Sequence, residues 1–183
     1  MLALSWSPTY CEDKGRDRGS RQCDPARRLG FVVHGLWPQN ERGYPTECGA
    51  DRFIPRDAMD EAMRVFPEAG LARYEWRRHG TCSGLAPAAY FRAAAAARDA
   101  VTIPEPLASP SRDGETSAQS IERAFAAVNP GLRPDMMSVQ CRRGELQEVR
   151  VCLTRDLRGF RPCPEVDRRS SCRFGPIRVG APR

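Results

Sequence analysis

Eight cysteines constrain the fold of this 183-residue chain more than any other feature of its sequence. Their number is even, they are spread along the chain, and no two form a Cys-x-x-Cys motif, so a zinc ribbon or a thioredoxin-like redox site has little support. Four disulfides are the better interpretation, and they indicate an oxidising compartment. Spacing alone leaves about 105 pairings open. The cysteines are Cys11, Cys23, Cys48, Cys82, Cys141, Cys152, Cys163 and Cys172.

The size and composition predict a single domain over residues 1–183, since 40% hydrophobic content is enough for a core. The apolar start of the chain ends at Ser5, too early for a secretion signal, and no stretch is long enough to cross a membrane. Together with the disulfides, this favours the mature part of a secreted or periplasmic protein, in which Met1 would be an added start residue.

The chain is basic, with a net charge of +6 and a pI of about 9.1, which favours a polyanionic partner. Lys14 is the only lysine among the 29 basic residues, and the planar fork of arginine suits bidentate contacts to phosphate. A GC-rich genome would also produce an excess of arginine and alanine. The charge is therefore only modest evidence for a nucleic-acid partner.

The hydrophobic pattern predicts an α+β fold, because strands and helices follow one another without regular alternation around an antiparallel sheet. The expected strands are 2–6, 29–33, 139–140 and 146–153, the last two joined in a hairpin at Arg143 and Gly144. The expected helices are 55–66, 73–79, 87–99 and 117–128. The expected loops are 12–28, 38–52 and 104–114, with a tail from 159 held by the last cysteines.

Two details of these helices are also predictions. Met59, Met63 and Phe66 recur at helical spacing and read as a core stripe. Gly80 is expected to cap the C-terminus of the helix over 73–79.

The only two histidines stand in similar surroundings. His34 and His79 are each followed by glycine, and each has a tryptophan within three residues. Histidine is the side chain whose ordinary pKa allows it to act as acid or base near neutral pH. A lone histidine is more often a packed core residue, but two in matched contexts favour proton transfer.

A helix over 73–79 would place Glu75, Arg78 and His79 on one face. Phosphoryl transfer needs such a set: a proton acceptor for the attacking hydroxyl, and a cation for the charge that develops on the phosphoryl oxygens. His34, arriving from a strand, would protonate the leaving oxygen. The alternative is an ordinary Glu–Arg pair on a surface helix, which contributes little to stability.

The segments 31–38 (FVVHGLWP) and 75–82 (EWRRHGTC) resemble, in the same order, the two active-site segments of the ribonuclease T2 family of exported endoribonucleases. The dipeptide at 10–11 is similar to an N-terminal segment of the family. The stretch from Cys141 through 146–149 to Cys152, and then Cys163 and Cys172, resembles the family's C-terminal sheet and cysteine pattern. Residues 83–138 match only loosely.

This resemblance implies a ribonuclease T2-like, disulfide-stapled α+β fold with a central antiparallel sheet. It implies metal-independent transphosphorylation of single-stranded RNA through a 2′,3′-cyclic phosphate, with broad base specificity. His79 would be the general base, His34 the general acid, and Glu75 and Arg78 would stabilise the phosphorane. Trp37, by stacking on a base, and Tyr74 would bind substrate. No cofactor, metal, membrane or obligatory protein partner is expected, and the chain is expected to be a monomer.

Two positions depart from the family. Arg78 stands where the family usually has lysine, and Tyr74 stands where it often has a third histidine, so a positive charge near the phosphate is lost. We expect activity to survive with weaker substrate binding. The resemblance also implies the disulfide pairs Cys11–Cys23, Cys48–Cys82, Cys141–Cys172 and Cys152–Cys163.

Two other functions remain as alternatives. The triplet 78–80 (RHG) is the core of the histidine phosphatase motif, although there it follows the first strand and continues differently. An exported RNA-binding or cytotoxic module with reduced catalysis is the second, and the presence of both histidines and Glu75 argues against it.

Overall fold

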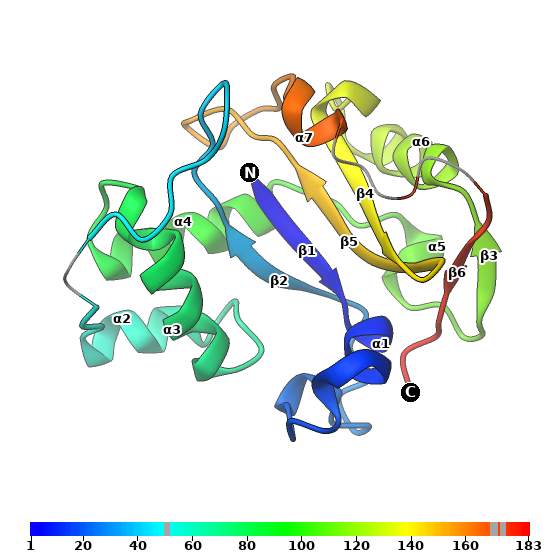
Figure 1. Cartoon of the computed structure of the whole chain (residues 1–183), viewed down its shortest axis with the longest axis horizontal. Coiled ribbons are helices and arrows are strands. Elements are labelled where there is room, and N and C mark those ends of the chain that lie inside the picture. Colours follow the sequence, from blue (N-terminus) through cyan, green and yellow to red (C-terminus); the bar gives the residue numbers. More distant parts are fainter. Residues whose placement is uncertain (50–51, 169–171, 173–174) are drawn as a thin grey trace.

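The computed structural model of the chain describes residues 1–49, 52–168, 172 and 175–183 and contains a six-stranded sheet (Figure 1). β1 lies between β2 and β5 and is antiparallel to both, and β4 pairs with the other edge of β5. Beyond the end of β1, Glu145 of β5 pairs in parallel with Arg178 of β6, so the sheet is not antiparallel throughout. The strands are β1 Leu2–Trp6, β2 Phe31–Leu36, β3 Gly114–Thr116, β4 Met137–Arg142, β5 Glu145–Val151 and β6 Ile177–Val179.

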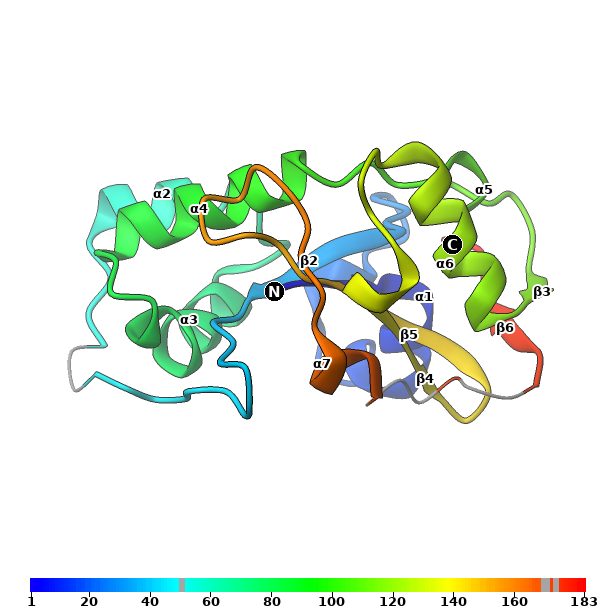
Figure 2. The ribbon, with the colours of Figure 1, turned by 90° about the horizontal axis from the view of Figure 1, so that it is seen from above.

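The predicted strands and helices are present, with shifted bounds and with short elements that the pattern did not reveal. The helices are α1 Ser7–Tyr10, α2 Arg56–Ala62, α3 Ala69–Arg78, α4 Pro87–Asp99, α5 Glu105–Ala108, α6 Ala118–Val128 and α7 Pro164–Arg168. A π-helical turn, Cys11–Gly15, continues α1. Figure 1 shows α2, α3 and α4 beside β2, and α5 and α6 towards the opposite side of the sheet. In Figure 2, α4, α5 and α6 run along one side of the sheet.

The core explains why these segments form these elements. Leu2, Leu4 and Trp6 of β1 are fully buried, as expected of the strand in the middle of the β2–β1–β5 arrangement. In α4, whose bounds match the prediction, Ala94 and Ala97 are also fully buried, which is close packing through small side chains. α6 begins after Ser117, whose hydroxyl accepts a hydrogen bond from the Ser120 amide as an N-cap.

Several predicted details are wrong. α2 ends at Ala62, so Met63 lies past it and is 40% exposed, whereas Phe66 is buried. Gly80 is not a left-handed cap: it opens a 3₁₀ turn, and a Cβ on it would lie 2.3 Å from the Trp76 ring, so close approach is what requires glycine there. The expected loops 12–28 and 104–114 contain helical turns, and the tail contains α7 and β6, which the pattern missed. Positions 50–51 of the expected loop and 169–171 and 173–174 of the tail lie outside the described residues.

The structure contains the four disulfides that the resemblance implied. Cys48–Cys82 joins the loop after β2 to the turn after α3, across 34 residues of sequence. Cys141–Cys172 and Cys152–Cys163 tie the C-terminal segment to β4 and to the residue after β5. Cys11–Cys23 closes the N-terminal helical turns.

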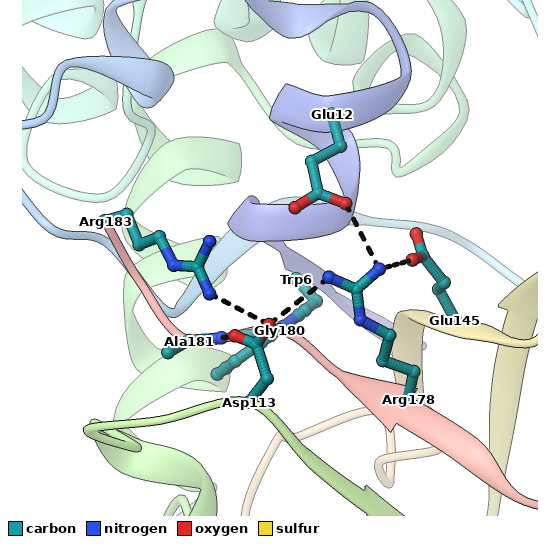
Figure 3. A network of polar contacts seen from close by, with 8 residues as sticks. All are labelled: Trp6, Glu12, Asp113, Glu145, Arg178, Gly180, Ala181 and Arg183. Atoms are coloured by element: carbon teal, nitrogen blue, oxygen red, sulfur yellow. Dashed lines mark hydrogen bonds and ion pairs between the residues drawn. The ribbon is translucent and has the colours of Figure 1, made fainter.

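Polar contacts hold the C-terminal strand in place (Figure 3). The Arg178 guanidinium lies between Asp113 and Glu145, at 3.3 and 2.6 Å, and approaches Glu12 at 3.9 Å. Asp113 also accepts from the Ala181 amide, and the indole of Trp6 donates to the Gly180 carbonyl at 3.0 Å. These contacts fix β6 against β3, β5 and the N-terminal turns.

Candidate active site

His34 sits within β2 at a β-bulge, not at the strand's end as the pattern suggested. Leu4 of β1 pairs with Val33 and Ala3 pairs with Gly35, so His34 is the extra residue between two paired positions. A bulge changes the direction of a side chain, and bulges are frequent beside active sites.

The sheet brings Glu148 to His34 across β1. Nδ1 of His34 is hydrogen bonded to Oε1 of Glu148, which lies on β5, two strands away. Neighbouring strands lie about 4.8 Å apart, and β1 lies between β2 and β5. A large side chain on β1 would therefore keep His34 and Glu148 from meeting. β1 presents Ser5 opposite Glu148 and Ala3 opposite Arg150, and these small side chains leave room for the contact. Sequence reasoning gave Glu148 no role, although it lies in the C-terminal segment that carries the resemblance.

Arg150 completes the sheet's contribution to the site. Its Nε and Nη2 donate to Oε2 of Glu148 at 2.9 and 2.8 Å, and Glu148 is 4% exposed. Glu148 and Arg150 are two positions apart on β5 and so share one face. That spacing was the only signal for Arg150 in the sequence.

α3 supplies Glu75, whose side chain is fully buried. Oε2 of Glu75 accepts a 2.6 Å hydrogen bond from Nε1 of Trp37, and Oε1 lies 3.7 Å from Nε2 of His34. A Cβ on residue 35 would lie 1.9 Å from Oε2 of Glu75 and 2.2 Å from Nε1 of Trp37, so only glycine fits at this position.

Trp37 contacts both imidazoles. The His79 ring stacks on it, with centroids 5.0 Å apart and an interplanar angle of 27°, and the His34 ring meets it edge-on at 5.2 Å. The Arg150 guanidinium lies 5.1 Å from the centroid of the indole. His79 is itself buried, at 7% exposed, and its Nδ1 has no hydrogen-bond partner among the described residues.

The surroundings shift the pKa values of the two imidazoles in opposite directions. Burial, helped by the charges of Arg78 and His34, lowers the pKa of His79 to about 4. Burial also disfavours charge on His34, but the hydrogen bond and charge of Glu148, with the charge of Glu75, outweigh it and raise the pKa of His34. The surroundings therefore favour the neutral form of His79 and the protonated form of His34.

The carboxylates differ in the same way. Burial raises the pKa of Glu75 to about 7, although the charge of His34 and the Trp37 hydrogen bond oppose it. Burial acts on Glu148 too, but the bond and charge of His34 and the contacts of Arg150 outweigh it and lower the pKa of Glu148. Glu148 is thus the firmly ionised carboxylate of the site.

The remaining predicted residues lie at its edge. Arg78 is half-buried, and its charge lowers the pKa values of both Glu75 and His79. Tyr74 is 42% exposed, and its ring faces the Arg77 guanidinium, 5.6 Å from the ring centroid. None of the contacts of the described residues joins Tyr74 to either histidine.

Two hollows adjoin these residues. One of about 100 Å³ reaches His34 and Glu148 and is also lined by Lys14 and Arg142. A larger one, of about 910 Å³, lies beside Trp37 between residues 38–42 and the segment 152–168, and neither histidine lines it. Among the predicted catalytic residues, the smaller hollow is lined by His34 alone.

In the described ranges, no group of three or more His, Cys, Asp or Glu side chains is placed to hold a metal ion. The same residues include no helix with the length and apolar character of a membrane span.

Similar proteins carry the name ribonuclease. A ribonuclease of Aeromonas hydrophila is 52% identical over 85 residues, which cover 46% of this chain and 37% of that protein. A probable ribonuclease of Haemophilus influenzae is 35% identical, and 38% of it is covered, so the chain spans well under half the length of these two relatives. Ribonuclease DdI of Dictyostelium discoideum is 27% identical over 91% of this chain and 78% of its own length.

Solved structures share the fold. A mutant of ribonuclease MC1 in complex with 5′-GMP superposes with a TM-score of 0.74 at 25% identity, over 96% of both chains, and ribonuclease MC1 comes from bitter gourd seeds. The family model described as Ribonuclease T2 family matches residues 1–163. A match over most of the sequence, found with the same fold, places the protein: the chain belongs to the ribonuclease T2 family.

Proposed function

We propose that the protein is an endoribonuclease that cleaves single-stranded RNA by metal-independent transphosphorylation, with broad base specificity, and leaves a 2′,3′-cyclic phosphate. The observation that carries this proposal is the contact of both imidazoles with one tryptophan, in surroundings that lower the pKa of His79 and raise the pKa of His34. The names of the relatives and the mononucleotide bound to ribonuclease MC1 support the same substrate class.

The chemistry follows from the two charge states. His79, neutral at the start, takes the proton of the 2′-hydroxyl as O2′ bonds to phosphorus. His34, protonated at the start, gives a proton to O5′ as the bond from phosphorus to O5′ breaks. One proton is accepted and one donated, and the products are a 2′,3′-cyclic phosphate and a 5′-hydroxyl.

Glu75 and Arg78 act on the pentacoordinate phosphorane between these steps. Charge on the phosphoryl oxygens is greatest there, so the Arg78 cation stabilises it more than it stabilises bound substrate. A neutral Glu75 carboxyl would donate a hydrogen bond to the same group, which its pKa of about 7 permits near neutral pH. Trp37 contacts both imidazoles and lines the larger hollow, where a base of the RNA would stack on it. Tyr74 binds substrate from the exposed side of α3.

We further propose that residues 1–183 form one catalytic domain, that the protein acts as a secreted or periplasmic monomer, and that it needs no cofactor. The two alternatives have less support. A histidine phosphatase would use the histidine after Arg78 as a nucleophile, and a non-catalytic RNA-binding module would not require the opposed charge states of the histidines.

The decisive experiment digests single-stranded RNA in excess EDTA and identifies the product ends. We expect 2′,3′-cyclic phosphates and 5′-hydroxyls. Retained cleavage with 3′-hydroxyl and 5′-phosphate ends, or complete loss of activity in EDTA, would overturn the mechanism.

Variants then assign the two roles. His34→Phe and His79→Phe are each expected to abolish cleavage of RNA. A uridine 3′-phosphate ester of 4-nitrophenol has a leaving group that needs no proton, so it should largely rescue His34→Phe and not His79→Phe. The reverse pattern would exchange the two roles, and rescue of neither variant would count against acid–base catalysis by this pair.

A further inference from the structure

We propose that Glu148, anchored by Arg150, is a positioning residue for the general acid: it holds the Nδ1 proton of His34, so that the ring keeps its Nε2 proton for the leaving oxygen. This inference rests on the proposed function for the role of His34. It extends that function by two residues, Glu148 and Arg150, to which no role has been assigned.

The contacts fix the carboxylate from both sides. Oε1 of Glu148 is bonded to Nδ1 of His34, and Oε2 receives two N–H groups of Arg150. An ionised carboxylate can only accept hydrogen bonds, so Nδ1 must carry a proton. Since both oxygens are held and the side chain is 6% exposed, Glu148 cannot turn away without leaving a buried charge unpaired.

Arg150 links this pair to the rest of the site. Its guanidinium also lies over Trp37, the residue whose Nε1 is bonded to Glu75. The ion pair between Glu148 and Arg150 is largely shielded from solvent, with side chains 6% and 26% exposed. Through Arg150 it connects β5 to Trp37, whose ring meets that of His34 edge-on.

The chemical consequence concerns both nitrogens of His34. With Nδ1 committed to Glu148, Nε2 is the nitrogen that faces Glu75, the other predicted catalytic group. When the Nε2 proton passes to O5′, the ring becomes neutral with its Nδ1 proton still donated to Glu148. The carboxylate takes no proton: it orients the ring and stabilises the imidazolium before transfer.

The charged groups that face His34 come from several elements. They are Glu148 and Arg150 of β5, Glu75 of α3, His79 after α3, and, around the smaller hollow, Tyr10, Asp13, Lys14, Glu68 and Arg142. Of the groups that act on the pKa of His34, only Glu148 and Glu75 raise it, whereas burial and Arg150 lower it. Removing the charge of Glu148 therefore leaves Arg150 beside the imidazolium, and the pKa of His34 must fall.

The first test measures that pKa directly. The chain has only two histidines, so an NMR titration follows each ring separately, and His79→Asn assigns the signals. We expect Glu148→Gln to lower the pKa of His34 by about one unit or more, a change that corresponds to the loss of one charge-assisted contact. The matched control is Glu145→Gln: Glu145 is on the same strand and is paired with Arg178 at 2.6 Å, away from His34. It should leave both histidines unchanged.

The second test is kinetic. On a dinucleoside monophosphate near neutral pH, Glu148→Gln should lower kcat about 10–100-fold with little change in KM, the loss seen when a carboxylate that orients a metal-bound histidine is removed. The alkaline limb of its pH–rate profile should move to lower pH. With the 4-nitrophenyl ester the loss should be under about threefold, because no proton is needed by the leaving group.

Glu148→Asp keeps the negative charge and covers the case in which Glu148→Gln does not fold. We expect the pKa of His34 to fall in the order wild type, Glu148→Asp, Glu148→Gln, and activity on the dinucleotide to follow it. An unchanged His34 pKa in a folded Glu148 variant, or an equal loss on both substrates, would make Glu148 a purely structural residue. If the wild type forms no cyclic phosphate, the proposed function fails, while the titration still decides whether Glu148 controls His34.

Discussion

Replacing Glu75 with glutamine should make the variant's stability, relative to wild type, improve from acid to alkaline pH, while it lowers activity. The folded state raises the pKa of this carboxyl from its ordinary value of 4.5 to about 7, chiefly through burial. Between these values the folded chain binds more protons than the unfolded chain, so the free energy of unfolding falls as the pH rises. At about 1.4 kcal/mol per pKa unit, the full cost above pH 7 is about 3 kcal/mol.

Glutamine has the same shape and can still accept the Trp37 hydrogen bond, but it never ionises. Any effect of the amide on the free energy of unfolding that does not depend on ionisation is the same at both ends of the pH range. The quantity predicted is therefore the change in the variant's stability relative to wild type, which should improve by about 3 kcal/mol between about pH 4 and about pH 8.

Urea unfolding with the disulfides intact measures this difference. Glu115→Gln, a substitution of an exposed carboxylate on β3, is the control and should show no such trend. If Glu75→Gln gained less than about 1 kcal/mol over that range, or lost stability, Glu75 would be ionised at little cost and the reasoning from burial would be wrong. Cleavage of RNA should fall in the same variant, because the carboxyl no longer serves the phosphorane.

Other substitutions test the packing and the charges of the site. Gly35→Ala places a Cβ 1.9 Å from Glu75 and should cost about 1–3 kcal/mol in urea unfolding together with most of the activity. Arg78→Ala should lower kcat more than it raises KM, and Arg78→Lys should stay active, whereas a change in KM alone would make the residue a ground-state contact. The Cys48–Cys82 disulfide closes a 34-residue loop, so replacing both cysteines with alanine should lower the free energy of unfolding by about 3–4 kcal/mol. Peptide mapping that joined Cys48 to another cysteine would contradict the pairing.

The parts of the fold that the sequence predicted well are those with strong local signals. α4 has a proline at its start and a long alanine-rich run, and its bounds were predicted correctly. β1 and β2 are short apolar runs between polar segments, and β1 was predicted in full. β6 and α7 carry no such signal, because three residues of strand and five of helix are held by Arg178 contacts, a disulfide and packing from distant parts of the chain.

The site shows the same division. His34, Glu75 and His79 stand in long recognisable segments, and the structure gathers all three around Trp37. Glu148 could not be predicted as their partner, because the contact depends on which strands flank β1. Nothing in the local sequence of β5 states that β1 separates it from β2, or that a bulge turns His34 towards it.

The two histidines look alike in the sequence, and the fold is what makes them different. His79 follows the last turn of α3, where the helix dipole alone would favour a charged imidazole by about 0.3–1 kcal/mol. Burial and the neighbouring Arg78 outweigh this and keep it neutral. His34 is half-buried, and burial also disfavours its charge, but only small side chains of β1 stand between it and the ionised Glu148 on β5. Burial alone would favour neutral imidazoles at both positions, and the negative charges of Glu148 on the sheet and Glu75 on α3 are what favour a protonated His34, the proposed acid.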